Sequence, residues 1–129
     1  MTSGHLLDTQ AFLLWRLDDP SFGRKAARLL DTATSGIHLS IASVWEICIK
    51  RSIGKLDLDV PTQELVETAV AAGVRLLPLR PEHLYRVESL PWHHRDPFDR
   101  LLLAQALVED LTVVGRDPEW PRYGVKLVW

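Results

Sequence analysis

Short apolar stretches alternate with helical patterns along the whole chain. Five segments read as strands: 6–7, 37–39, 74–79, 111–114 and 125–129. The segments between them carry helix caps, or apolar residues three and four positions apart, and these features predict helices. Strands that alternate with helices predict a parallel sheet with helices on both faces, and right-handed crossovers place all the strand ends on one edge.

The segment from His94 to Leu107, HRDPFDRLLLAQAL, contains the clearest helix start. Asp96 is a good N-cap, Pro97 suits the first helical position, and an apolar run follows. Asp99 then lies in the first turn, so two carboxylates project from one helix end. An acidic first turn also stabilises the helix dipole, which is a purely structural interpretation of the same residues.

Three other acids are expected near the same edge of the sheet. Asp8 follows the first strand, where Thr9 can cap the next helix, and Asp117 follows the strand at 111–114. Glu46 lies in the first turn of a helix that we expect to begin at Ser43. Together with Asp99, these side chains should converge, because strand ends at one edge form the usual ligand site of a parallel sheet.

Each of these acids also has a structural alternative. An aspartate after a strand commonly initiates a turn, as the Asp117-Pro118 pair can. Glu46 can complete a capping box with Ser43, and it can pair with Lys50 one helical turn later.

Crowded carboxylates require a neutralising partner. Two of them at 4 Å repel by about 4 kcal/mol at an effective dielectric constant near 20. A shared cation resolves this repulsion, and ligands that are all oxygen favour Mg²⁺ or Mn²⁺ over zinc or copper. Such ions suit phosphoryl transfer, so phosphodiester hydrolysis is the leading reaction.

Composition limits the class of protein and the cellular compartment that we expect. The chain has 129 residues, which we interpret as a single domain over 1–129, with 47% hydrophobic and 25% charged residues. A net charge of −2 argues against a broad cationic surface for duplex DNA. The single cysteine, Cys48, falls in an apolar helical pattern, so we expect a core residue and a reducing compartment. No stretch is long and apolar enough to cross a bilayer, and we expect a cytoplasmic protein without membrane contact.

Positive charge is concentrated locally. Candidate phosphate contacts are Lys50, Arg95 and Arg100. The adjacent histidines His93 and His94 lack the spacing of a helical zinc pair, so a zinc site is not expected.

Four segments together resemble a known family. LLDT at 6–9, SVWEICIK at 43–50, HRDPFDRLLLAQA at 94–106 and VVGRD at 113–117 are similar to a PIN domain, and within that family to VapC-type toxins. The resemblance implies a three-layer α/β/α sandwich with a central parallel sheet. It also implies a magnesium-dependent endoribonuclease, usually a homodimer, that a small cognate antitoxin inhibits.

The resemblance assigns roles residue by residue. Asp8 and Asp99 match the principal metal ligands, Glu46 the second acid and Asp117 the fourth. Asp96 matches an auxiliary acid, which we interpret first as a helix cap. The family commonly has Thr or Ser where this chain has Gly115, so hydroxyl support would come from Thr9 or Ser43 instead.

We therefore expect Asp8, Glu46, Asp99 and Asp117 to hold one or two Mg²⁺ ions, with Mn²⁺ as an alternative, and a metal-bound water to attack an RNA phosphodiester. The alternative is a catalytically silent PIN-like module that binds a basic partner peptide. A phosphatase of the haloacid-dehalogenase type is disfavoured, because it needs a second aspartate where this chain has Gln10.

Overall fold

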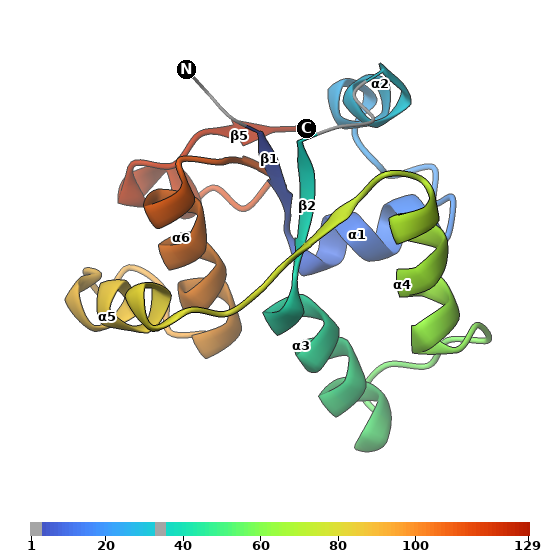
Figure 1. The fold of residues 1–129 in the computed structure, drawn as a ribbon, viewed down its shortest axis with the longest axis horizontal. Helices are drawn as coiled ribbons and strands as arrows, with labels where there is room; N and C mark the ends of the chain where they lie inside the picture. Colours follow the sequence, from blue (N-terminus) through green and yellow to red (C-terminus); the bar gives the residue numbers. More distant parts are fainter. Residues whose placement is uncertain (1–3, 33–35) are drawn as a thin grey trace.

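The computed structural model describes residues 4–32 and 36–129 and contains a five-stranded sheet (Figure 1). All four strand pairs are parallel, and the strand order is β3-β2-β1-β4-β5. The strands are β1 (His5–Leu7), β2 (Ile37–Ser40), β3 (Arg75–Leu77), β4 (Thr112–Val114) and β5 (Leu127–Val128). The predicted parallel sheet is therefore confirmed, with strands shorter than expected at β3 and β5.

Helices follow the strands, as the alternating pattern predicted. They are α1 (Thr9–Arg16), α2 (Arg24–Thr32), α3 (Ile41–Ser52), α4 (Thr62–Ala71), α5 (Pro81–Ser89) and α6 (Pro97–Glu109), with a short 3-10 helix η1 (Trp120–Tyr123). None of the helices described here combines the length and the apolar character that crossing a bilayer requires.

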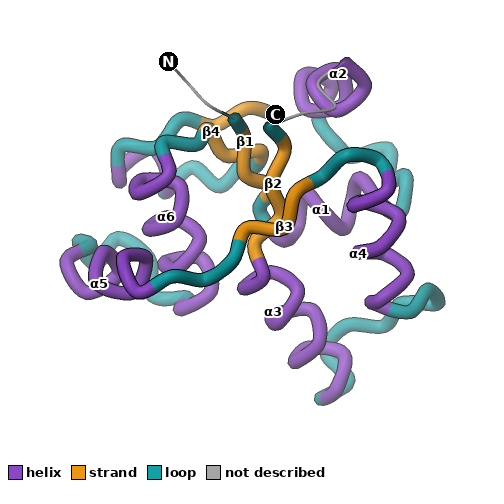
Figure 2. The backbone as a smooth tube through the Cα atoms, in the orientation of Figure 1, coloured by secondary structure: helices purple, strands orange, loops and turns teal. Residues whose placement is uncertain are grey.

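The two faces of the sheet pack against different helices. Leu6 and Val113 point into one apolar core, which the buried leucines of α6 complete. Their neighbours Leu7 and Val114 point into a second core, shared with Phe12 of α1. Successive strand residues face opposite sides, so the alternation separates the two cores. Figure 2 shows α5 and α6 on one side of the strands and α1 and α4 on the other, which is the expected three-layer α/β/α sandwich.

The strand order creates a crevice beside β1. The chain passes from β1 to β2 and β3 on one side, and then crosses to β4 and β5 on the other side. In open parallel sheets, the carboxyl ends of the strands at such a reversal form the usual ligand site. Asp8 follows β1 and Asp117 follows β4, so both acids flank this crevice.

The expectation that Cys48 belongs to the core is wrong. Cys48 is exposed on α3, whereas Glu46 and Ile47 of the same helix are buried. The helical period places residue 48 on the outer face, and a cysteine in an otherwise apolar run does not reveal that orientation.

Arg100 is a structural residue in the first turn of α6. It is 3% exposed, and its guanidinium stacks on the Trp92 ring at 3.8 Å from the centroid. It donates hydrogen bonds to four backbone carbonyls, those of Val87, Leu90, Pro91 and His94. The expectation that Arg100 contacts a substrate phosphate is therefore wrong, because its guanidinium fixes the loop between α5 and α6.

We predict that Arg100→Met lowers the free energy of unfolding by about 3 kcal/mol, because it leaves buried carbonyl groups without donors. Urea unfolding followed by circular dichroism measures the loss. The matched control is Arg95→Met, five residues earlier and exposed, which should change stability by less than about 0.5 kcal/mol. Equal stability of the two variants would contradict this role for Arg100.

Candidate metal centre

A cavity of about 670 Å³ opens at the carboxyl ends of β1 and β4. Its lining contains five carboxylates: Asp8, Glu46, Asp96, Asp99 and Asp117. It also contains three cationic side chains: Lys50, Lys55 and Arg116. The structure thus places all four acids of the predicted site, and the auxiliary acid, around one cavity.

Asp8 reaches the cavity as the N-cap of α1. Its Oδ1 accepts a hydrogen bond from the backbone N–H of Ala11 at 2.6 Å. The expectation that Thr9 caps this helix is wrong, because Thr9 is the first helical residue. The Thr9 hydroxyl instead donates to Ser43 Oγ at 2.9 Å, in a buried contact that joins α1 to α3.

Helix α3 begins earlier than the sequence pattern predicted. Ser40 is its N-cap, and the Ser40 hydroxyl accepts from the backbone N–H of Ala42 at 3.0 Å. Ser43 is therefore a helical residue, and the capping-box interpretation of Ser43 and Glu46 is wrong. Glu46 lies in the second turn and is only 4% exposed, so its side chain enters the cavity from the buried face of α3.

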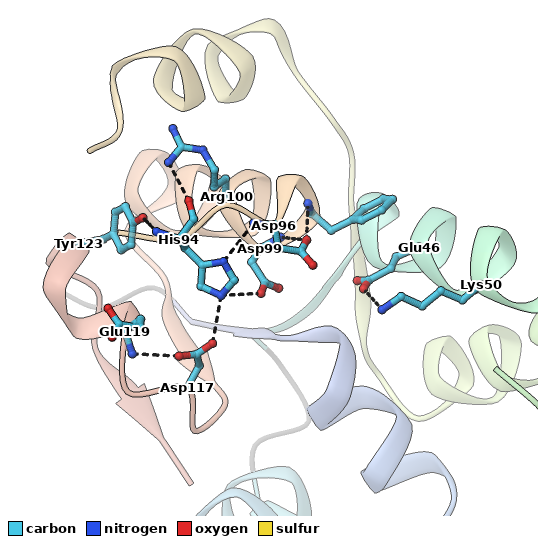
Figure 3. A network of polar contacts seen from close by, with 10 residues as sticks. Glu46, Lys50, His94, Asp96, Asp99, Arg100, Asp117, Glu119 and Tyr123 are labelled. Carbon is cyan, nitrogen blue, oxygen red and sulfur yellow. Dashed lines mark hydrogen bonds and ion pairs between the residues drawn. The ribbon is translucent and has the colours of Figure 1, made fainter. Parts of the chain in front are cut away.

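The two carboxylate oxygens of Glu46 have different surroundings. Lys50 Nζ donates to Oε2 at 2.6 Å, and Figure 3 shows this pair beside the aspartates. Oε1 is buried and has no hydrogen-bond partner among the residues that the structure describes. Lys50 thus neutralises Glu46 through one oxygen and leaves the other oxygen available for a ligand.

Asp96 has the capping role that the sequence predicted. Its Oδ1 accepts from the backbone N–H groups of Phe98 at 2.9 Å and Asp99 at 3.2 Å. The cap holds the first turn of α6 at the cavity wall, and thereby places the Asp99 side chain among the other acids.

His94 bridges two of the acids, and the sequence interpretation did not include it in the site. Its Nε2 lies 3.0 Å from Asp99 Oδ2 and 3.3 Å from Asp117 Oδ2 (Figure 3). Within the described part of the chain, these three residues form the group whose ligand atoms all lie within 4.8 Å of one another. Asp8 and Glu46 line the same cavity but lie outside this group. The sequence feature that could have pointed to His94 as a site residue is its position two residues before the N-cap Asp96.

Burial and mutual repulsion raise the pKa of two acids in the cavity. The pKa of Asp8 rises to about 6, mainly through burial, with smaller contributions from the charges of Asp117 and Glu46. The pKa of Asp99 rises to about 7, again mainly through burial, then through the charge of Asp96. His94 lowers the pKa of Asp99, but by less than these two effects raise it. The surroundings therefore disfavour the charged forms of both acids, and a cation would favour them.

Gly115 lies directly against Asp8. A Cβ atom at this position would lie 2.5 Å from Asp8 Oδ2, which is closer than real contacts allow. The Asp8 carboxylate therefore occupies the space that a Thr or Ser side chain would need. In this chain, the absence of a hydroxyl at position 115 is coupled to the placement of Asp8.

The cationic side chains around the cavity differ in part from those expected. Lys50, one of the candidate phosphate contacts, lines the cavity, and its ammonium group forms the ion pair with Glu46 that the sequence also offered. Arg116 and Lys55 are exposed, and the sequence interpretation did not name either as a phosphate contact. Arg95 is exposed but is not part of the lining.

Comparison with known proteins identifies the family. The family model of the PIN domain matches residues 5–126. The chain belongs to the PIN domain family. A comparison with curated protein sequences finds no significant match.

Several solved structures resemble the fold of this PIN domain. VapBC2 from Rickettsia felis, bound to a DNA fragment from its promoter, matches with a TM-score of 0.70 and 15% identity over 96% of both chains. FitAcB from Neisseria gonorrhoeae matches with a TM-score of 0.69 and 19% identity over 97% of this chain and 96% of that one. A toxin–antitoxin complex from Klebsiella pneumoniae matches with a TM-score of 0.61 and 16% identity over 98% and 97%. At these identities the likeness establishes the fold.

We predict that Asp99→Asn removes a pH dependence of stability in the metal-free protein. The ordinary pKa of an aspartate is 3.8 and the folded protein raises that of Asp99 to about 7, so the folded state binds the proton more tightly. The contribution of Asp99 to stability is therefore full below pH 4 and is lost as the pH rises towards 7. Urea unfolding at pH 5 and pH 8 with EDTA should show a smaller loss for Asp99→Asn than for the wild type.

The exposed Asp57 supplies the control for this prediction. Asp57→Asn should lose as much stability as the wild type between pH 5 and pH 8. If Asp99→Asn behaved like this control, the proposed repulsion and burial at Asp99 would be contradicted.

Proposed function

We propose that this PIN domain protein is a Mg²⁺-dependent endoribonuclease. The observation that supports it best is the convergence of Asp8, Glu46, Asp99 and Asp117 on one cavity, with the pKa of two of them raised. The choice of RNA as substrate rests on the resemblance to VapC-type toxins. The choice of a phosphodiester rests on the combination of carboxylates that can hold a metal and cations at the rim of the cavity.

The residues present fit a hard divalent cation. The acids supply oxygen ligands, and the free Oε1 atom of Glu46 is a buried acceptor that a cation or its bound water can satisfy. When bound, Mg²⁺ or Mn²⁺ supplies an activated water and positive charge for the phosphate. The residues that would hold it are Asp8, Asp99 and Asp117, with Glu46 directly or through water.

Lys50, Lys55 and Arg116 are the side chains that would bind the phosphate groups beside the acids. Arg116 and Lys55 are exposed, although the Arg116 guanidinium lies over the Trp129 ring at 4.9 Å from its centroid, and Lys50 is held by Glu46. Arg95, outside the lining, would contact a more distant phosphate. Thr9 and Ser43 support the acids through the hydrogen bond that joins their helices.

We further propose that the chain is the toxin of a toxin–antitoxin pair, acts in the cytoplasm and forms a homodimer. The support for the pair is that similar folds occur in VapBC2 from Rickettsia felis and in a toxin–antitoxin complex from Klebsiella pneumoniae. The support for the dimer is the family resemblance, and α3 exposes Ile41 and Trp45, which a second copy could cover.

We predict that Asp8→Asn and Asp8→Ala both lower the rate of Mg²⁺-dependent RNA cleavage by about 100-fold or more, because each removes a charge that holds the cation. The two variants should differ in stability. Asparagine keeps an oxygen for the cap on Ala11, whereas alanine loses the cap and about 1 kcal/mol. Cleavage of a fluorescent RNA and urea unfolding with EDTA measure the two effects.

Metal titration distinguishes the nuclease from a silent module. In the wild type, millimolar Mg²⁺ or Mn²⁺ should raise the melting temperature, and either Asp8 variant should reduce this shift. Asp57→Asn should keep both the shift and the cleavage. A wild-type protein that neither cleaves RNA nor responds to these ions would instead be an interaction module.

We predict that a short neighbouring reading frame encodes a DNA-binding antitoxin that co-purifies with this chain and inhibits cleavage. Light scattering after size-exclusion chromatography should give the isolated chain twice its 14.7 kDa mass. The absence of such a reading frame would favour a housekeeping nuclease, and a mass of one chain would contradict the dimer.

A further inference from the structure

The His94 residue is anchored on several sides. Its backbone N–H donates to the Tyr123 hydroxyl at 2.6 Å, and its carbonyl accepts from Arg100 Nη1 at 3.3 Å. The ring nitrogen Nδ1 accepts from the backbone N–H of Asp96 at 3.2 Å. The imidazole therefore has a defined position beside the carboxylates of Asp99 and Asp117 (Figure 3).

The bond from Asp96 selects the tautomer of the ring. Because Nδ1 accepts a hydrogen bond, the proton of the neutral imidazole resides on Nε2. Nε2–H then donates towards Asp99 Oδ2 and Asp117 Oδ2, at 3.0 and 3.3 Å. A metal ligand would need a free lone pair on Nε2, so this arrangement makes His94 a hydrogen-bond donor rather than a ligand.

The Nε2–H proton of His94 lies beside the Asp99 and Asp117 oxygens, where a cation shared by these two acids would bind. Two oxygens bound to one Mg²⁺ ion at about 2.1 Å lie at most about 4.2 Å apart. The ligand atoms of Asp99 and Asp117 already lie within 4.8 Å of each other, with Nε2 beside both. The Nε2–H group and a shared ion would therefore compete for the same position beside the two carboxylates.

We propose that His94 is a positioning residue whose Nε2–H takes the place of the cation between Asp99 and Asp117 and leaves when a divalent ion binds. It bridges the two carboxylates in the metal-free protein, and its hydrogen bonds must be broken on binding. This inference rests on the proposed metal-dependent function. Because these hydrogen bonds are lost when the ion binds, His94 lowers the affinity of the site for the ion.

Nuclear magnetic resonance of the wild-type protein with ¹⁵N-labelled histidine tests directly whether a divalent ion displaces the Nε2–H group of His94 from the two carboxylates. In the metal-free protein, long-range ¹⁵N–¹H spectra at pH 8 should show the Nε2–H tautomer for His94. Titration with Mg²⁺ should shift the Nε2 signal of His94, while the signals of the exposed neighbour His93 stay unchanged. An Nδ1–H tautomer, or a His94 signal that Mg²⁺ does not move, would overturn the proposal.

Calorimetric titration of variants measures the energetic effect. His94→Ala should bind Mg²⁺ about tenfold more tightly than the wild type, because no hydrogen bonds to the carboxylates are lost on binding. His94→Gln keeps a donor and should bind Mg²⁺ nearly as the wild type does. The matched control is His93→Ala, whose affinity should equal that of the wild type.

The outcomes separate this inference from the proposed function. Weaker or unchanged Mg²⁺ binding by a folded His94→Ala protein would overturn the role of His94, while cleavage by the wild type would leave the nuclease intact. A wild-type protein and a His94→Ala variant that both fail to bind Mg²⁺ or Mn²⁺ would overturn both.

Discussion

The crowding of carboxylates in one partly buried cavity is the constraint on which the rest of the structure depends. The parallel sheet brings Asp8 and Asp117 to one edge, and α3 and α6 add Glu46 and Asp99 to the same cavity. Burial is the main cause that raises the pKa values of Asp8 and Asp99, and the charges of neighbouring carboxylates raise them further. The fold tolerates this arrangement because its two apolar cores, one on each face of the sheet, supply stability elsewhere.

Two of these acids are also structural parts of the helices that carry the site. Asp8 caps α1 and Asp96 caps α6, so their oxygens satisfy backbone N–H groups that would otherwise lack partners. The positive end of each helix dipole partly offsets the repulsion at the cavity. The structural and functional interpretations of an acid at a helix start are therefore compatible, since one oxygen can cap the helix while the other faces the cavity.

Local signals predicted the order of strands and helices and the Asp96 cap, because apolar runs and capping residues act over a few positions. Features that depend on packing between distant segments were not predictable in the same way. The start of α3 at Ile41 depends on the Ser40 hydroxyl, which also donates to Gln105 of α6 at 2.5 Å. The burial of Arg100 depends on carbonyl groups of the preceding loop, and the role of His94 depends on Asp117 in the loop that follows β4.

Lys50 and His94 act differently on the acids that they contact. Lys50 belongs to the same helix as Glu46 and carries a permanent charge, yet it contacts only one carboxylate oxygen and its side chain is 45% exposed. His94 contacts two acids from different elements, and it can do so as a neutral donor. A lysine at the rim can therefore remain while an ion binds to the free Glu46 oxygen. The His94 imidazole contacts both carboxylates, so the imidazole and an ion cannot occupy the position between them at the same time.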